Sequence, residues 1–150
     1  MTTGSGKKKC CGKCIKVCLP LLLVALVAIQ FVPVERTNPA VSMEVDAPAD
    51  VVAVLKQSCY DCHSNETTWP WYSKVAPVSW LVAHDVEEGR EHVNFSEWDT
   101  YSAEDRRKIA EEAYEEAEEG KMPIWFYVML HGDAKLSDSD LASLKAWAGE

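Results

Sequence analysis

The chain has 150 residues, of which 47% are hydrophobic and 26% are charged, and its formal net charge is −9. This length suits one domain, and the composition excludes a disordered chain, a collagen and a transporter with several membrane spans. Six of the 15 basic residues but only one of the 24 acidic residues lie before position 37, which leaves 9 basic and 23 acidic residues, a net charge of −14, from Thr37 onward. Because this part is so acidic, no nucleic-acid partner is expected.

The N-terminal leader predicts a membrane anchor. Five lysines precede Val17 to Val34, a stretch of 18 residues without a charged side chain, and a helix of that length is roughly 27 Å long, just enough to cross a hydrocarbon core. We expect a cytoplasmic tail over residues 1–16, one transmembrane helix over residues 17–34, and the acidic part on the other side, because lysines favour the cytoplasmic side. A cleaved signal peptide is the alternative, but Ala25 and Ala28 form no small-x-small cleavage site.

The leader also holds four of the six cysteines. A reducing cytoplasm argues against disulfides there. No second pair of ligands follows the CxxC of the leader at the usual spacing of a zinc site. We interpret these residues as juxtamembrane thiols that are at most acylated, and we assign them no function. They are Cys10, Cys11, Cys14 and Cys18.

A linker over residues 35–47 leads to a domain over residues 48–150 that is predicted to be all-α. Apolar side chains at helical spacing indicate helices over residues 48–57, 77–89, 102–119 and from Ser137 onward, with an irregular loop over residues 64–76. Ser102 with Asp105 resembles a capping box, and Gly120 marks a helix end. The segment 123–131 is apolar on nearly all sides, so we expect it to be buried. No alternating pattern of a β-strand is found.

Such a domain has a thin core. About 100 residues in short helices bury a limited apolar area, and small domains of this kind often need a further stabilising group. The chain also contains six tryptophans. A large flat cofactor would give these aromatic side chains a surface to pack against.

The first predicted helix of the domain runs into Cys59-Tyr60-Asp61-Cys62-His63, a C-x-x-C-H sequence that is typical of c-type haem attachment. Two thiols one helical turn apart can add to the two vinyl groups on one edge of the porphyrin, and the adjacent His63 is then the proximal iron ligand. A thioredoxin-like site would need a preceding strand, a zinc site needs four ligands, and a disulfide leaves His63 unexplained. We therefore predict one covalently bound haem c per chain.

The second axial ligand is predicted to be Met122. It lies between the helix-ending Gly120 and Pro123, where a loop can turn a thioether toward a haem while the proline stiffens it. The other candidates are Met43, Met129, which is expected to be core filler, His84, His92 and His131.

Several motifs carry a resemblance to known proteins. The C-x-x-C-H, the Met122-Pro123 pair and the closing helix with Trp147 are similar to those of small class I cytochromes c. Three further segments resemble the bacterial membrane-anchored haem-binding domain proteins, and the similarity extends from about residue 30 to the C-terminus. The resemblance implies a cytochrome c-like all-α fold around a covalent haem. With the lysines of the leader, we expect a single-pass protein of a bacterial inner membrane whose domain is periplasmic or otherwise extracytoplasmic. These segments are residues 36–39, residues 62–73 and residues 77–80.

The resemblance to cytochromes c also implies surroundings for the haem. A proline carbonyl after the C-x-x-C-H commonly accepts the Nδ1–H of the proximal histidine. We expect Pro77 in that role, with Pro70 second. Aromatic side chains are expected to form the wall of the pocket, namely Trp69, Trp71, Tyr72, Trp80 and Trp125.

The acidic side of the helix over residues 102–119 lies close to Met122 in the sequence. A solvated face is the default interpretation, and the alternative is a docking surface that steers a basic electron-transfer partner. This face comprises Glu111, Glu112, Glu115, Glu116, Glu118 and Glu119.

The sequence thus favours a membrane-tethered monohaem carrier of single electrons that is not an enzyme, because ligation by His63 and Met122 leaves the iron no position for a substrate. A five-coordinate haem sensor or peroxidase-like protein, in which Met122 only packs, is one alternative. A haem subunit of a larger oxidoreductase is the other.

Overall fold

The computed structural model describes residues 11–149, with side chains from residue 16 onward. Cys10 and the side chains of Cys11 and Cys14 therefore lie outside the described part. The described chain is all-α, as predicted, and its β structure is limited to an isolated bridge between Met43 and Glu97. The α-helices are α1 (Cys11–Ala28), α2 (Ala49–Ser58), α3 (Tyr60–His63), α4 (Val78–His92), α5 (Ala103–Glu118), α6 (Trp125–Leu130) and α7 (Asp138–Ala148). Short 3₁₀ helices are η1 (Ile29–Phe31), η2 (Trp71–Lys74), η3 (Trp98–Thr100) and η4 (Gly132–Ala134).

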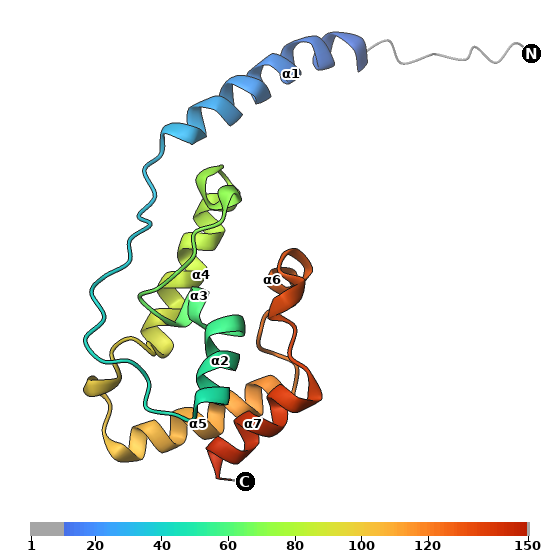
Figure 1. The fold of residues 1–150 in the computed structure, drawn as a ribbon. Helices are drawn as coiled ribbons and strands as arrows, with labels where there is room; N and C mark the ends of the chain where they lie inside the picture. Colours follow the sequence, from blue (N-terminus) through green and yellow to red (C-terminus); the bar gives the residue numbers. More distant parts are fainter. Residues whose placement is uncertain (1–10, 150) are drawn as a thin grey trace, which may run out of the picture.

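The apolar leader forms α1, which stands apart from the rest of the chain (Figure 1), and η1, whose Gln30 side chain is hydrogen-bonded to Ala76. The prediction of one continuous helix from Val17 to Val34 is wrong at its C-terminal end, because α1 ends at Ala28 and the backbone is extended at Val32. Val32 precedes Pro33, whose ring disfavours helical geometry in the residue before it. Among the residues that the structure describes, no helix is both long enough and apolar enough to pass through a membrane.

The hydrophobic core lies at the opposite end of the molecule, where α2, α5 and α7 meet (Figure 1). Phe95 in the loop before η3 and Trp98 at the start of η3 add two aromatic rings to this core, and the two rings pack against each other. Burial of these apolar side chains is the main stabilising contribution at this end. The core includes Val51, Leu55, Phe95, Trp98, Tyr114 and Leu144.

Two of the predicted helix starts are capping boxes in the structure. The Ser102 hydroxyl accepts from the Asp105 backbone N–H, and the Asp105 carboxylate accepts from the backbone N–H of Ser102. Ser137 and Asp140 make the same exchange at the start of α7. Gly120 follows α5 with a φ of 68°, a left-handed conformation that glycine adopts without steric cost. These helix ends are confirmed.

Two predictions about helices are wrong. The helix expected to stop at Gly89 continues as α4 to His92, so this glycine is in the helix interior. The segment 123–131, expected to be buried, contains α6, and α6 has no buried residue. Its apolar side chains are half-buried or exposed, because α6 lies beside the domain rather than inside it (Figure 1).

Candidate functional site

Two adjoining cavities lie around the C-x-x-C-H sequence. The larger has a volume of about 350 Å³ and is bounded by α3, α4 and the segment that leads into α6. The smaller, of about 130 Å³, extends from it toward the core between α2 and α5. Together they make one site of the size range in which small ligands and cofactors bind. Side chains that line both are Ser58, Cys59, His63, His92, Met122 and Pro123.

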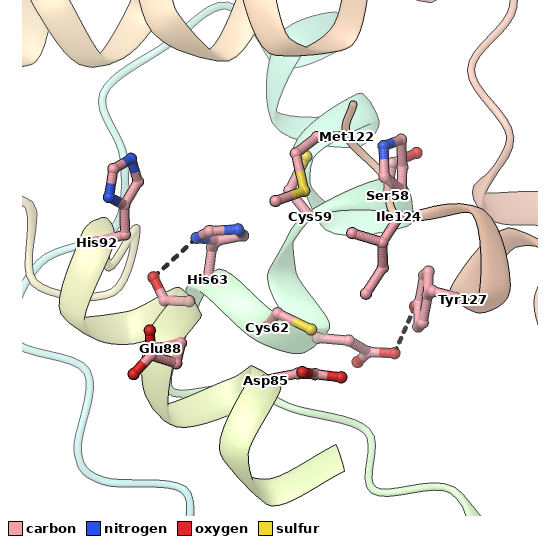
Figure 2. A pocket seen from close by; sticks show the side chains of 13 residues that line it. Ser58, Cys59, Cys62, His63, Asp85, Glu88, His92, Met122, Ile124 and Tyr127 are labelled. Atoms are coloured by element: carbon pink, nitrogen blue, oxygen red, sulfur yellow. Dashed lines mark hydrogen bonds between the residues drawn. The ribbon is translucent and has the colours of Figure 1, made fainter. Parts of the chain in front are cut away.

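The two motif cysteines are held by one turn of helix. The backbone N–H groups of Cys62 and His63 both donate to the carbonyl of Cys59, at 3.2 and 2.9 Å. This turn places both sulfurs at the larger cavity (Figure 2). Burial raises the pKa of each thiol to about 12, with a further contribution from negative charge at Cys62 for Cys59 and at Asp61 for Cys62. Both thiols are therefore protonated at neutral pH, and they are not joined in a disulfide.

His63 is held with a defined tautomer. Its Nδ1 lies 2.8 Å from the carbonyl oxygen of Gly89 and 3.3 Å from that of Val93, and a carbonyl only accepts, so Nδ1 is the donor. Nε2 then carries the lone pair that a metal can accept, on the ring edge turned away from Gly89 (Figure 2). Burial lowers the pKa of His63, which favours this neutral form.

The acceptor for His63 differs from the prediction. The expected carbonyls, first that of Pro77 and then that of Pro70, instead accept backbone N–H groups within their own turns, from Trp80 and Ser73. The observed acceptor is in α4 because that helix passes directly over the motif. Sequence patterns of turns gave no indication of this helix contact.

Gly89 permits that approach. A Cβ atom at this position would lie 2.7 Å from the carbonyl oxygen of Cys62 and 3.1 Å from the Cys62 Cβ. Separations this short are incompatible with a side chain unless the backbone moves. The sequence signal was the glycine itself, which is interpreted as a helix end from the sequence but lies inside α4, where a glycine often marks a packing contact.

Of the predicted second ligands, two share the site with His63. Met122 and His92 line both cavities, and Figure 2 shows them on either side of the His63 ring in that view. The others do not line it. His84 lines a different cavity, and Met43 pairs with Glu97. His131 bonds to Tyr72, and Met129, predicted to be core, is 69% exposed.

The aromatic residues expected around the cofactor lie elsewhere. None of the five lines either cavity at the motif. Trp69 and Trp80 line a separate cavity between the linker and α4, whereas Trp71 and Trp125 are exposed. The rings were assigned to the pocket on their composition alone, and no periodicity fixed which way they point.

Tyr127 is the aromatic residue that the sequence did not identify at the site. It lines the larger cavity, and its hydroxyl donates to the Asp61 carboxylate at 2.7 Å (Figure 2). The other oxygen of Asp61 accepts the backbone N–H of Thr68 at 2.8 Å. Asp61 is the second x of the C-x-x-C-H. The bond from Tyr127 therefore attaches α6 to the motif itself.

The open sides of the site are acidic. Asp85 and Glu88 line the larger cavity, and Glu112 and Glu116 line the smaller one. Within the described residues neither lining includes a lysine or arginine. Burial raises the pKa of Asp85. The predicted acidic face of α5 thus reaches the site through Glu112 and Glu116.

The chain matches one known protein family over most of its length. A family model described as Haem-binding domain matches residues 24–150. The chain belongs to this haem-binding domain family. No curated protein and no solved structure gives a significant match. Haem binding is thus shown at the level of the family, and the matched range includes the whole C-x-x-C-H and both cavities.

The residues that line the site of this haem-binding domain are suited to holding a haem. Two protonated thiols and a neutral imidazole with a fixed tautomer face one cavity, and the Ser58 hydroxyl that lines both cavities is buried without a hydrogen-bond partner. An unsatisfied buried hydroxyl costs free energy unless a ligand supplies a partner. Zinc, an alternative for the two cysteines, finds no support, because the described part holds no cluster of three or more ligating side chains.

Proposed function

We propose that the domain binds one haem c and carries single electrons. Cys59 and Cys62 would form the two thioether links, His63 would be the proximal ligand, and Met122 the distal ligand. The observation that carries this proposal is that these four side chains line one continuous site, although they come from α3, the residue just before it and the segment before α6.

The haem would supply an iron that changes oxidation state by one electron. The chain's own contribution is to hold the ligands. The Gly89 carbonyl orients the His63 imidazole and makes it a stronger donor to a metal. A thioether as the second ligand raises the reduction potential relative to a second imidazole. With two protein ligands the iron has no open position, which is why a carrier is favoured over an enzyme.

We also propose that the apolar leader tethers the domain to a bacterial inner membrane, with the domain in the periplasm. The support is the surface of α1 and η1: the leucines and valines described there are exposed and have no protein surface to cover them. The lysines before α1 favour a cytoplasmic N-terminus. Retention of the full chain in membranes washed with alkaline carbonate tests the tether, and release into the wash would contradict it.

The acidic α5 is proposed to face a basic redox partner. Glu112 and Glu116 stand at the cavity, where their charge would steer a cationic protein toward the haem edge. Glu116 also forms an ion pair with Lys121, which partly neutralises the negative charge of Glu116. Reduction by a basic partner should slow as salt rises, and a rate independent of salt would exclude this steering.

The haem attachment is tested on the full chain expressed with a cytochrome c maturation system. A haem-stained band on a denaturing gel and a mass increase of one haem are expected. Cys59→Ala and Cys62→Ala should each remove one thioether and reduce the staining. Cys18→Ala is the matched control, because Cys18 is an exposed thiol outside the site, and it should stain fully. An unmodified mass in the parent chain would overturn the proposal.

The distal ligand is tested by comparing Met122→Ala with His92→Ala. Met122→Ala should abolish the thioether–iron band near the red end of the ferric spectrum and allow rapid binding of carbon monoxide by the ferrous protein. His92→Ala should leave both properties unchanged. If the parent protein lacks the thioether–iron band, and His92→Ala rather than Met122→Ala allows rapid carbon monoxide binding, the distal ligand is His92.

A five-coordinate haem sensor or peroxidase-like protein is the second candidate. The observation that favours it is that Met122 is 40% exposed, so the chain around it is not tightly closed. Rapid carbon monoxide binding by the unmodified ferrous protein would support this candidate. A haem subunit of a larger oxidoreductase is distinguished by the proteins that co-purify with the full chain in mild detergent.

A further inference from the structure

Three segments that are distant in the sequence are joined by side-chain hydrogen bonds near the point where α1 leaves the domain. The Gln30 side chain in η1 accepts the backbone N–H of Ala76 and donates to the carbonyl of the same residue, each at 3.0 Å. The Tyr72 hydroxyl in η2 and Nε2 of His131, just after α6, are 2.6 Å apart and hydrogen-bonded. η1, η2 with the start of α4, and α6 are therefore attached to one another.

These segments expose large apolar side chains, which we call the apolar end face. Phe31 is 82% exposed, Trp71 76% and Trp125 75%. Exposed apolar residues are ordinary when scattered singly, but a cluster of this kind marks an interaction surface. The apolar end face comprises Phe31, Trp71, Val75, Val78, Leu81, Trp125, Met129 and Leu130.

The same segments lack the acidity of the rest of the domain. Residues 67–84 contain no aspartate or glutamate and one lysine, Lys74, and residues 120–132 contain none and one lysine, Lys121. Elsewhere from Thr37 onward the 23 acidic residues are spread through the remaining chain. A negatively charged lipid surface would repel the acidic parts of the domain and would not repel this face.

We infer that the apolar end face lies on the phospholipid bilayer, with Trp71 and Trp125 at the level of the headgroups. This inference rests on the proposed tether. η1 lies near the C-terminal end of the apolar leader, and its Gln30 side chain is hydrogen-bonded to Ala76. If the leader is inserted in a bilayer, this attachment keeps the apolar end face close to the lipid surface. Tryptophan is enriched at this depth because its ring is apolar and its N–H is polar.

Contact with the bilayer would also orient the haem site. α5, with Glu112 and Glu116 at the smaller cavity, lies at the other end of the molecule from α1 (Figure 1). With the apolar end face on the lipid, the acidic end faces the solvent and is accessible to a soluble redox partner. A tether without this contact would leave the domain free to rotate.

The test uses the full chain labelled with 5-fluorotryptophan in nanodiscs of phosphatidylethanolamine and phosphatidylglycerol, with any haem kept reduced. The fluorine signals of Trp71 and Trp125 are assigned from the Trp71→Phe and Trp125→Phe variants. Gadolinium is then introduced either on a lipid headgroup or as a water-soluble chelate. Trp98, which is 2% exposed in the core, and Trp147 on α7 are the matched controls.

We expect the lipid-bound gadolinium to abolish the Trp71 and Trp125 signals and to leave those of Trp98 and Trp147, while the soluble chelate spares Trp71 and Trp125. Loss of the two signals with the soluble chelate and not with the lipid would overturn the inference. If the Trp71 and Trp125 signals persist with both gadolinium agents, the inference is also overturned. The apolar end face would then be assigned to a protein partner, which includes a second copy of this chain. Carbonate extraction on the same sample separates these results from a failed tether, and haem staining separates them from failed haem binding.

Discussion

Nδ1 of His63 donates a hydrogen bond to the carbonyl oxygen of Gly89 across 2.8 Å. At the same glycine α4 passes close to the motif, because the missing side chain leaves room for the Cys62 carbonyl. One residue of α4 therefore both orients the imidazole and permits the helix contact that closes the cavity. The site depends on this contact between α3 and α4 as much as on the C-x-x-C-H.

Gly89→Ala should destabilise the domain. In a helix interior alanine is normally more stable than glycine by roughly 0.5–1 kcal/mol, but here the new Cβ would meet the Cys62 carbonyl at 2.7 Å. We expect a net loss of about 1–3 kcal/mol in the free energy of unfolding, the usual cost of overpacking, measured by urea denaturation. Gly132→Ala is the control, since nothing lies within 4 Å of its Cβ position. Equal stability of the two variants would show that the contact is not restrictive.

Much of the architecture could be predicted from local sequence signals. The helix starts at Ser102 and Ser137 depend on residues a few positions apart, and such short-range chemistry acts the same way in most contexts. The C-x-x-C-H carries its own geometry, because one helical turn brings the two thiols together. These predictions needed no knowledge of how distant segments pack.

The features that sequence reasoning missed all depend on such packing. The local sequence at Gly89 indicates a helix end, although the role of this residue is set by Cys62, 27 residues earlier. α6 was predicted to be buried because it is apolar, yet its exposure is set by where the chain places it. Composition gives the number of tryptophans but not the directions of their rings, so Trp71 and Trp125 were assigned to the pocket in error.

Arg90 should anchor the linker to the loop that follows the C-x-x-C-H. Its guanidinium donates to the carbonyls of Ser64 and Thr37 at 2.8 and 3.0 Å, and to side-chain oxygens of Thr67 and Asn38 at 2.9 and 3.2 Å. We expect Arg90→Ala to lower the free energy of unfolding by about 1.5–3 kcal/mol, the range for hydrogen bonds to a charged group. The linker should also become sensitive to limited proteolysis.

Arg90→Lys should recover little of that loss, because one ammonium group cannot replace the planar fork of donors. Arg107→Ala is the matched control: its guanidinium pairs with Glu111 on an exposed face, and we expect a change within about 0.5 kcal/mol. Full recovery by lysine would show that Arg90 acts through its charge alone.

The Tyr127–Asp61 bond should couple α6 to the motif. Burial and the Asp61 carboxylate hold the pKa of Tyr127 well above its usual range, so the hydroxyl remains a donor at alkaline pH. A double-mutant cycle with Tyr127→Phe and Asp61→Asn should give a coupling of about 1–2 kcal/mol in unfolding. The cycle of Tyr127→Phe with Asp50→Asn is the control, since Asp50 instead bonds to Ser143, and it should be additive. Additivity in the first cycle would contradict the role assigned to this bond.

The two motif thiols should be unreactive in the folded chain before haem is attached. Burial raises the pKa of Cys59 and of Cys62 to about 12, so at pH 8 very little of either is thiolate, the form that reacts with iodoacetamide. We expect their alkylation, followed by peptide mass spectrometry, to be slower by roughly tenfold or more than in urea. The rate in the folded chain should rise about tenfold per pH unit from 8 to 10, because the thiolate fraction does so below the pKa, whereas in urea it should level off near the ordinary pKa of about 8.5. Cys18, which is exposed, should react at similar rates in both conditions. A rate at Cys59 or Cys62 that levels off below pH 10 without urea would show that these thiols are solvated rather than enclosed, and the cavity would then be open to water before the haem arrives.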